Sequence, residues 1–342
     1  MTIGIVKDLR YLKHDMGSFH VESPGRLEAI YKMIETEIDF PLTIIEPRPA
    51  SEEEIGFIHS SSYVKFISQT AGKERVYLDP DTSTSAGTYE AALLAAGGLM
   101  KAADSIMEGK IRSGFALVRP PGHHAEADQA KGFCVFNNVA IAAEYLVRKY
   151  GLKRILIADW DLHHGNGTQN AFYQRKDVLF FSTHQFPFYP GSGFWDEVGE
   201  DAGEGFTVNV PLSAGKTDEE YLFIYRNILG PIAAAYKPEF ILVSAGFDIY
   251  ADDPLGGMLV TGEGFGALAA ELMGLAGKLA RDRILFTLEG GYSLEGLADG
   301  VREILQQLSG RKAPPAIRAD ISITTQKEIA PVIDIQRRFW PL

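Results

Sequence analysis

The chain alternates short apolar runs with longer segments in which apolar residues recur every three or four positions. Short apolar or β-branched runs are typical of buried strands, and a period of about 3.6 residues is typical of helices with one buried face. The predicted strands are residues 2–6, 42–46, 115–118, 154–159, 178–184, 207–212, 240–247 and 283–291. The predicted helices are residues 24–38, 86–108, 136–150, 217–236, 262–280 and 293–308.

This alternation predicts an α/β fold with a mostly parallel β-sheet flanked by helices. Residues 240–247 (FILVSAGF) are apolar nearly throughout, as strands are when helices cover both faces of a parallel sheet. No linker or repeat interrupts the pattern before about residue 310, so we predict one domain over residues 1–310. Residues 311–342 are less periodic, and we expect an extension packed on the domain or on a partner subunit of a homo-oligomer.

Composition narrows the functional classes. The 342 residues carry a net charge of −12, which argues against a nucleic-acid partner. Cys134 is the single cysteine, which excludes both a disulfide scaffold and a thiolate metal site. The N-terminal residues lack a signal-peptide pattern, and no apolar run approaches the roughly 18–20 residues that span a membrane. We therefore expect a cytoplasmic protein with no membrane partner.

Polar side chains gather where the predicted strands end. Ligands of open parallel sheets bind outside the carboxyl ends of the strands. The stretch DWDLHHGNG brings Asp159, Asp161 and His163 directly after a buried strand. Asp161 and His163 are two positions apart, so an extended chain projects both to one side, as two ligands of a divalent metal such as zinc. The alternative explanation is that this stretch is an ordinary polar turn that binds no metal ion.

Three further strand ends supply candidate groups. His123 and His124 follow residues 115–118 on a Pro-Pro-Gly turn, where both imidazoles can line one pocket, although a surface pair is the alternative. Asp248 ends an apolar strand and is the natural third metal ligand, with a helix N-cap as its other explanation. Tyr292 follows Gly290 and Gly291 and can donate to an oxyanion, unless it is only a packed ring.

These groups fit metal-assisted hydrolysis of an amide. A metal makes water more acidic and polarises the carbonyl, a histidine transfers the proton, and a tyrosine stabilises the oxyanion. No nucleophile elbow and no phosphate-binding glycine loop follows a predicted strand, so serine-hydrolase and nucleotide chemistry have no support.

Several of these stretches together resemble one enzyme family. RPPGHHA, GFCVFNN, DWDLHHGNGTQ, SAGFDIYADDPLGGM and LEGGYSLEGL are similar to the zinc-dependent histone deacetylase and acetylpolyamine amidohydrolase family. HDMGSFHVESPGRL extends the likeness toward the N-terminus, so that it covers roughly residues 1–310. The resemblance is strongest to a class II-like bacterial member and implies the arginase/deacetylase fold.

The resemblance implies a role for each matching residue. Asp161, His163 and Asp248 match the zinc ligands, and His123, His124 and Tyr292 match the catalytic residues, with His124 as the principal base and acid. Structural potassium is implied at two sites. The first comprises Asp159, Ser182 and Thr183 with backbone oxygens of Asp161 and His163; the second comprises backbone oxygens of Phe172, Arg175, Val178 and Phe206. Asn166 stands beside the second histidine, where class I members carry an aspartate, and Arg26 matches an arginine near an internal cavity.

The same resemblance suggests how substrate is held. Gly132, Phe133 and Tyr189 match the walls of an acyl-lysine tunnel. Leu255 stands where a polyamine-selective relative carries a glutamate that binds an ammonium group, so an acyl-lysine substrate is favoured. Asp79 and Asp81 lie in a short rim segment and could accept hydrogen bonds from a peptide backbone, although an ordinary Asp-Pro-Asp turn explains them as well.

Three alternatives remain open at this point. The substrate could be an acetylpolyamine or another small acylated amine rather than acyl-lysine in a peptide or protein. The chain could also be an inactive acyl-lysine binding protein, but no expected catalytic group is missing. An arginase-like binuclear metal site would need further ligands, for which His164 and Asp252 are the spare candidates.

Overall fold

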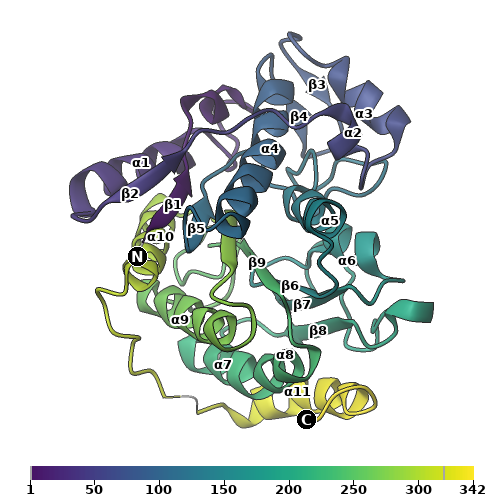
Figure 1. Ribbon diagram of the computed structural model, residues 1–342, viewed down its shortest axis with the longest axis vertical. Helices are drawn as coiled ribbons and strands as arrows, with labels where there is room; N and C mark the ends of the chain where they lie inside the picture. The colour runs from purple at the N-terminus through teal and green to yellow at the C-terminus, as the bar shows by residue number, and fades with distance from the viewer. Residues whose placement is uncertain (1, 319) are drawn as a thin grey trace.

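A single parallel sheet organises the molecule. The structure, a computed structural model, describes residues 2–318 and 320–342. Its main sheet has eight strands in the order β2-β1-β5-β10-β9-β6-β7-β8, and all neighbouring pairs are parallel (Figure 1). The strands are β1 (Ile3–Val6), β2 (Leu42–Ile45), β5 (Ser113–Ala116), β6 (Ile155–Asp159), β7 (Val178–Gln185), β8 (Thr207–Leu212), β9 (Phe240–Ala245) and β10 (Ile284–Leu288). The predicted single-domain α/β class and all eight predicted strands are confirmed.

Helices cover both faces of this sheet. The α-helices are α1 (Gly25–Glu37), α2 (Glu52–Ile55), α3 (Ser61–Ser68), α4 (Thr88–Met107), α5 (Asn138–Tyr150), α6 (Asn166–Phe172), α7 (Asp218–Ile224), α8 (Gly230–Tyr236), α9 (Gly262–Leu279), α10 (Leu294–Ser309) and α11 (Ile323–Gln336). In Figure 1, α4 and α5 lie on one side of the central strands, and α7, α8, α9 and α10 lie on the other.

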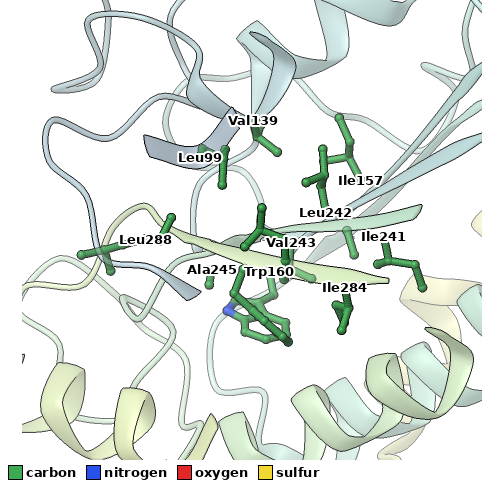
Figure 2. Close-up of a cluster of buried hydrophobic side chains, with 14 of the residues drawn as sticks. Leu99, Val139, Ile157, Trp160, Ile241, Leu242, Val243, Ala245, Ile284 and Leu288 are labelled. Carbon is green, nitrogen blue, oxygen red and sulfur yellow. The ribbon is translucent and has the colours of Figure 1, made fainter. Parts of the chain in front are cut away.

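The core explains why the central strands are nearly continuous in apolar residues. Leu242 and Val243 in β9 are fully buried. Figure 2 shows Leu99 and Val139, from α4 and α5, on one side of β9 and β10, and Trp160 on the other. Because adjacent strand residues point to opposite faces, a strand covered on both sides must be apolar at every position.

Some elements differ from the prediction. The helix expected over residues 217–236 contains α7, a π-helical turn η3 (Tyr225–Leu229) and α8. Helices α3 and α6 and the antiparallel pair β3 (Val76–Tyr77) and β4 (Ser83–Thr84) were not predicted, because they are too short to show a period. Two 3-10 turns, η1 (Leu9–Lys13) and η2 (Asp201–Gly203), complete the described elements.

The C-terminal extension packs on the edge of the sheet. Helix α11 lies against β8, and Gln336 Nε2 donates to the backbone oxygen of Thr207 at 3.1 Å. Trp340 Nε1 donates to the backbone oxygen of Gly205 at 2.8 Å. These contacts fit the intramolecular docking that was one of the two expectations for residues 311–342; the domain boundary at residue 310 stays a prediction. Among the described residues, no helix combines the length and the apolarity needed to cross a bilayer.

The topology fixes where a site can form. Strands β5, β10, β9 and β6 are consecutive in the sheet, so their carboxyl ends lie side by side. The predicted functional residues follow these four strands: His123 and His124 after β5, Asp161 and His163 after β6, Asp248 after β9 and Tyr292 after β10. Residues up to 169 positions apart in the chain are thereby gathered at one edge.

Candidate active site

Two carboxylates and one imidazole converge at this edge. One ligand atom each from Asp161, His163 and Asp248 lies within 4.8 Å of the others. Nδ1 of His163 is 3.2 Å from Asp161 Oδ1 and 3.1 Å from Asp248 Oδ2. All three side chains are nearly or fully buried. Buried carboxylates are very unfavourable without a cation, so this arrangement suits a divalent metal with nitrogen and oxygen ligands.

Backbone amides hold the carboxylates in place. Gly290 N donates to Asp161 Oδ2 at 2.8 Å, and Leu162 N donates to Asp248 Oδ1 at 2.9 Å. The remaining carboxylate oxygens thus point toward His163. A Cβ at Gly290 would lie 2.4 Å from Asp248 Oδ2, and only glycine leaves room for both aspartates there. Such outer hydrogen bonds orient metal ligands.

The pKa values of two residues in the cluster are raised, which favours the binding of a positive charge. Burial, together with the neighbouring Asp161, raises the pKa of Asp248 to about 7. Burial alone would lower the pKa of His163, but hydrogen bonds to Asp161 and Asp248 raise it to about 9. Asp248 and His163 therefore bind protons more strongly than ordinary side chains do, whereas, against the effect of burial, the neighbouring histidines lower the pKa of Asp161. A metal ion would compete with the protons on Asp248 and His163.

The two adjacent histidines have different partners. His123 Nδ1 bonds Asp159 Oδ2 at 3.0 Å, and His124 Nδ1 bonds Asn166 Oδ1 at 2.8 Å. Their ring centroids are 4.0 Å apart, and both rings line the same cavity. Burial would lower the pKa of His123, but Asp161 and Asp159 raise it instead. Burial and the two neighbouring histidines, His123 and His163, lower the pKa of His124.

Tyr292 is positioned through its backbone. The amides of Tyr292 and Ser293 donate to Asp253 Oδ2 at 2.6 and 3.0 Å. Arg26 is fully buried and donates from Nε to the backbone oxygen of Gly291 at 2.6 Å. Its guanidinium carbon lies 5.1 Å from the centre of the Tyr292 ring. Arg26 thus supports the turn that aims Tyr292 at the cavity, rather than lining the cavity itself.

These groups lie at a cavity of about 230 Å³. Its walls are mainly apolar and aromatic, which suits the stem of a long side chain. The lining residues are Asp81, Pro121, His123, His124, Gly132, Phe133, Cys134, His163, Phe188, Tyr189, Leu255, Gly290 and Tyr292. Gly132 has a φ of 54°, and a Cβ there would lie 2.4 Å from His124 Cδ2, so only glycine fits beside the histidine.

The rim aspartates have separate places. Asp81 lines the cavity, whereas Asp79 is not among the residues that form it. Asp79 Oδ1 accepts from the amides of Asp81 and Thr82 at 2.9 and 2.5 Å. This is the turn geometry that the sequence left as an alternative. Of the two aspartates, only Asp81 borders the cavity that would receive a substrate.

Ser182 and Thr183, which are expected to bind potassium, lie on β7 beside Asp159 at the end of β6. Ser182 is the register partner of Asp159, and its Oγ bonds His184 Nδ1 at 2.9 Å. Thr183 Oγ1 is buried without a hydrogen-bond partner in the described chain. At the second expected site, the backbone oxygens of Phe172 and Phe206 each accept one amide, at 2.9 Å. Both potassium sites stay predictions.

Several residues of the site were not singled out from the sequence. Phe188 lines the cavity and stacks on His163 with centroids 5.6 Å apart. Glu289 is fully buried and accepts from the amides of Gly122 and His123 at 2.7 and 3.1 Å. Its position directly after β10 was a usable signal, because a carboxylate at the end of a buried strand needs partners. His164 Nδ1 bonds Ser192 Oγ at 2.8 Å, and its Nε2 bonds Gln169 Oε1 at 3.0 Å.

Comparison with known proteins identifies the family. Residues 20–308 match the model of the histone deacetylase domain. The chain belongs to the histone deacetylase family. Its relatives are deacetylases, which implies a hydrolase. A probable deacetylase of Archaeoglobus fulgidus is 40% identical over 299 residues, covering 86% of this chain and 83% of the relative.

Other members of the family are plant and animal proteins. Histone deacetylase 15 of Arabidopsis thaliana is 39% identical over 330 residues, covering 94% of this chain and 59% of the relative. The polyamine deacetylase HDAC10 of Mus musculus is 42% identical over 311 residues, covering 85% of this chain and 45% of the relative. This deacetylase-family chain thus spans about half the length of several relatives. The assignment to a bacterial, class II-like branch stays a prediction.

A solved structure extends the comparison to the whole chain. The crystal structure of the HDA15 HD domain superimposes with a TM-score of 0.93 and is 38% identical. The match covers 99% of this chain and 95% of that chain. The predicted deacetylase fold is confirmed.

Proposed function

We propose that the protein is a zinc-dependent amidohydrolase that removes acetyl or other acyl groups from the ε-amine of lysine. One observation carries the proposal: Asp161, His163 and Asp248 converge beside a narrow apolar cavity lined by two histidines and a tyrosine. Two carboxylates and one imidazole suit catalytic zinc, because three protein ligands leave a position for water or substrate. Zinc supplies a Lewis acid that makes water more acidic and polarises a carbonyl.

His124 is the proposed general base. The amide group of Asn166 donates from Nδ2 to Glu126 Oε1 at 2.6 Å, which orients Oδ1 toward His124. His124 must then donate from Nδ1, which leaves a lone pair on Nε2 to accept a proton from water. Its lowered pKa keeps the ring neutral and ready to do so. The same nitrogen would later return the proton to the departing lysine amine.

His123 and Tyr292 are proposed to stabilise developing negative charge. The carboxylates around His123 raise its pKa and favour the protonated ring, so we assign it an electrostatic role rather than that of the base. The Tyr292 hydroxyl would donate to the oxygen of the carbonyl as it becomes negative. Removal of one such donor typically costs a few kcal/mol of transition-state stabilisation.

The walls of the cavity support an acyl-lysine substrate. Phe133 and Tyr189 offer aromatic surfaces to the methylene stem, and Asp81 lies where a peptide amide could donate to it. Leu255 adds an apolar side chain to the lining, with no charge for a secondary ammonium. Structural potassium at Asp159, Ser182 and Thr183 is part of the proposal, and the unpartnered hydroxyl of Thr183 is compatible with it.

A substrate panel tests the preference and the reason given for it. The wild-type protein is expected to have a higher kcat/KM for an acetyl-lysine peptide than for acetylputrescine or acetylspermidine. In Leu255→Glu, the ratio of kcat/KM for acetylspermidine to that for the peptide should rise about tenfold, because a carboxylate in the cavity attracts the substrate's ammonium groups.

Leu255→Gln is the matched control, since it has the same shape without the charge. Its ratio should stay within about threefold of wild type. A wild-type preference for acetylputrescine would favour the alternative, a small-amide amidohydrolase like the mouse polyamine deacetylase. Binding of acetyl-lysine without turnover would instead favour the inactive binding protein.

A further inference from the structure

A second group of buried donor atoms lies at the cavity. One ligand atom each from His123, Cys134 and Glu289 lies within 4.8 Å of the others. The exposed fractions of the three residues are 2%, 0% and 0%. None of them belongs to the Asp161–His163–Asp248 set, yet His123 and Cys134 both line the same cavity. An ion that enters the cavity can therefore contact two of the three residues directly.

The three side chains come from separate segments that the fold holds firmly. Cys134 closes a tight turn through backbone hydrogen bonds with Lys131 at 3.0 and 3.2 Å. Glu289 ends β10, and Ser244 Oγ in β9 donates to its Oε1 at 3.1 Å. His123 is fixed through Nδ1 by Asp159. Its Nε2 lies 3.7 Å from Asp161 Oδ1, too far for a hydrogen bond.

Each residue thus keeps a free donor position. In His123 the available atom is Nε2, because Nδ1 is bonded to Asp159. Cys134 offers its sulfur, and Glu289 Oε1 accepts only the hydrogen bond from Ser244. The ligand atoms of one tetrahedral ion with bonds of about 2.0–2.3 Å lie roughly 3.3–3.8 Å apart. The three ligand atoms now lie within 4.8 Å of one another. Side-chain movements of about 1 Å would bring them to the spacing of a tetrahedral site. Sulfur, nitrogen and oxygen together favour a thiophilic divalent ion such as zinc or cadmium.

We propose that His123, Cys134 and Glu289 form a second, inhibitory binding site for a thiophilic divalent metal ion. On binding, the thiol proton, and the imidazolium proton where His123 carries one, pass to solvent, and metal–sulfur and metal–nitrogen bonds form. The single cysteine excludes thiolate metal sites when the sequence is considered alone, and this proposal corrects that prediction. A mixed site needs only one thiolate, which the fold brings beside an imidazole and a carboxylate.

Occupancy of this site would oppose turnover. An ion there takes up Nε2 of His123 and fills the cavity next to the reacting groups. Excess zinc should therefore inhibit the enzyme after one zinc per chain has activated it. This kinetic consequence rests on the proposed function, whereas the binding of the ion does not.

A spectroscopic titration tests the site directly. Protein holding one zinc per chain is titrated with cadmium, and sulfur-to-cadmium charge-transfer absorbance is recorded. Cys134 is the single cysteine of the sequence, and the Asp161–His163–Asp248 set has no sulfur, so such a band reports this site alone. We expect a band that saturates at one cadmium per chain, is absent in Cys134→Ser and needs at least tenfold more cadmium in Glu289→Gln.

Near-ultraviolet circular dichroism and the zinc content of each variant show whether it has folded with its first metal bound. Absence of the band at saturating cadmium in folded wild-type protein would overturn the proposal, as would an unchanged cadmium affinity in Glu289→Gln. A protein that shows the band but hydrolyses no acyl amide supports the metal site and contradicts the proposed function. A protein that hydrolyses acyl-lysine but shows no band supports the proposed function and contradicts the metal site.

Discussion

Replacement of His124 by alanine is expected to lower kcat/KM for an acetyl-lysine peptide by about 10²- to 10⁴-fold. The hydrogen bond from His124 Nδ1 to Asn166 leaves Nε2 as a proton acceptor in the cavity, and the low pKa of the ring keeps that acceptor available at neutral pH. Without it, water must lose its proton to bulk solvent, and the amine must leave without a positioned acid. Steady-state kinetics with zinc-loaded protein measures the loss.

A purely structural role for His124 would give a similar loss, so chemical rescue distinguishes the two. Because His124 lines the cavity, the alanine variant leaves space for free imidazole, which should restore part of kcat in a concentration-dependent manner. The variant should retain one zinc per chain and the melting behaviour of wild type. Activity within about tenfold of wild type would contradict the assignment of His124 as the base.

The substitution Glu22→Gln is expected to lower the free energy of unfolding by about 3–5 kcal/mol. Glu22 is fully buried and accepts hydrogen bonds from Arg26 Nη1 at 3.1 Å and Arg119 Nη2 at 2.7 Å. Burial is the largest single influence and opposes its ionisation, but Arg119 and His14 together outweigh burial and hold the pKa of the carboxyl well below its usual value. Glutamine keeps the shape but leaves two buried guanidinium groups without their anion.

The direction in which the free energy of unfolding changes with pH provides a further check on the role of Glu22. Because the pKa of Glu22 is lower in the folded state, its contribution is present above the unfolded-state pKa of about 4.5 and is lost as the pH falls through the folded-state pKa. Denaturant unfolding should therefore show a weaker acid dependence in Glu22→Gln than in wild type. The matched control is Glu35→Gln, an exposed partner of Lys7, which should cost less than about 1 kcal/mol. Equal losses in the two variants would refute the account of Glu22.

The sheet could be predicted because its signal is local. Each strand of the main sheet is a short apolar run, and every residue of β6 and β9 is buried, so the sequence marks both the strand and its environment. Helix α11 gave a weaker signal, because few of its residues are buried and Pro331 lies inside it.

The candidate site was predictable in part for a related reason. The carboxyl ends of neighbouring parallel strands share one edge, so residues that follow strands are brought together whatever their distance in sequence. This placed Asp161, His163 and Asp248 correctly beside one another. The resemblance to deacetylases then implied roles that spacing alone left open, such as that of His124 as the principal base and acid.

The supporting contacts could not be predicted from sequence. Arg26 reaches the backbone of Gly291 across 265 positions, and Arg119 reaches Glu22 across 97. Neither arginine carries a local sign of burial, since arginine is ordinarily exposed. Similarly, Asp253 accepts from the Tyr292 amide only because two loops meet in the folded chain, and no local pattern in the sequence reveals that meeting.

The central claim is that one zinc ion at Asp161, His163 and Asp248 drives hydrolysis of acyl-lysine. The most direct measurement is acetate release from an acetyl-lysine peptide as zinc is added stepwise to metal-free protein. The account predicts no turnover without metal and a linear rise that reaches its maximum at one zinc per chain. Turnover by metal-free protein, or none at one bound zinc per chain, would contradict it.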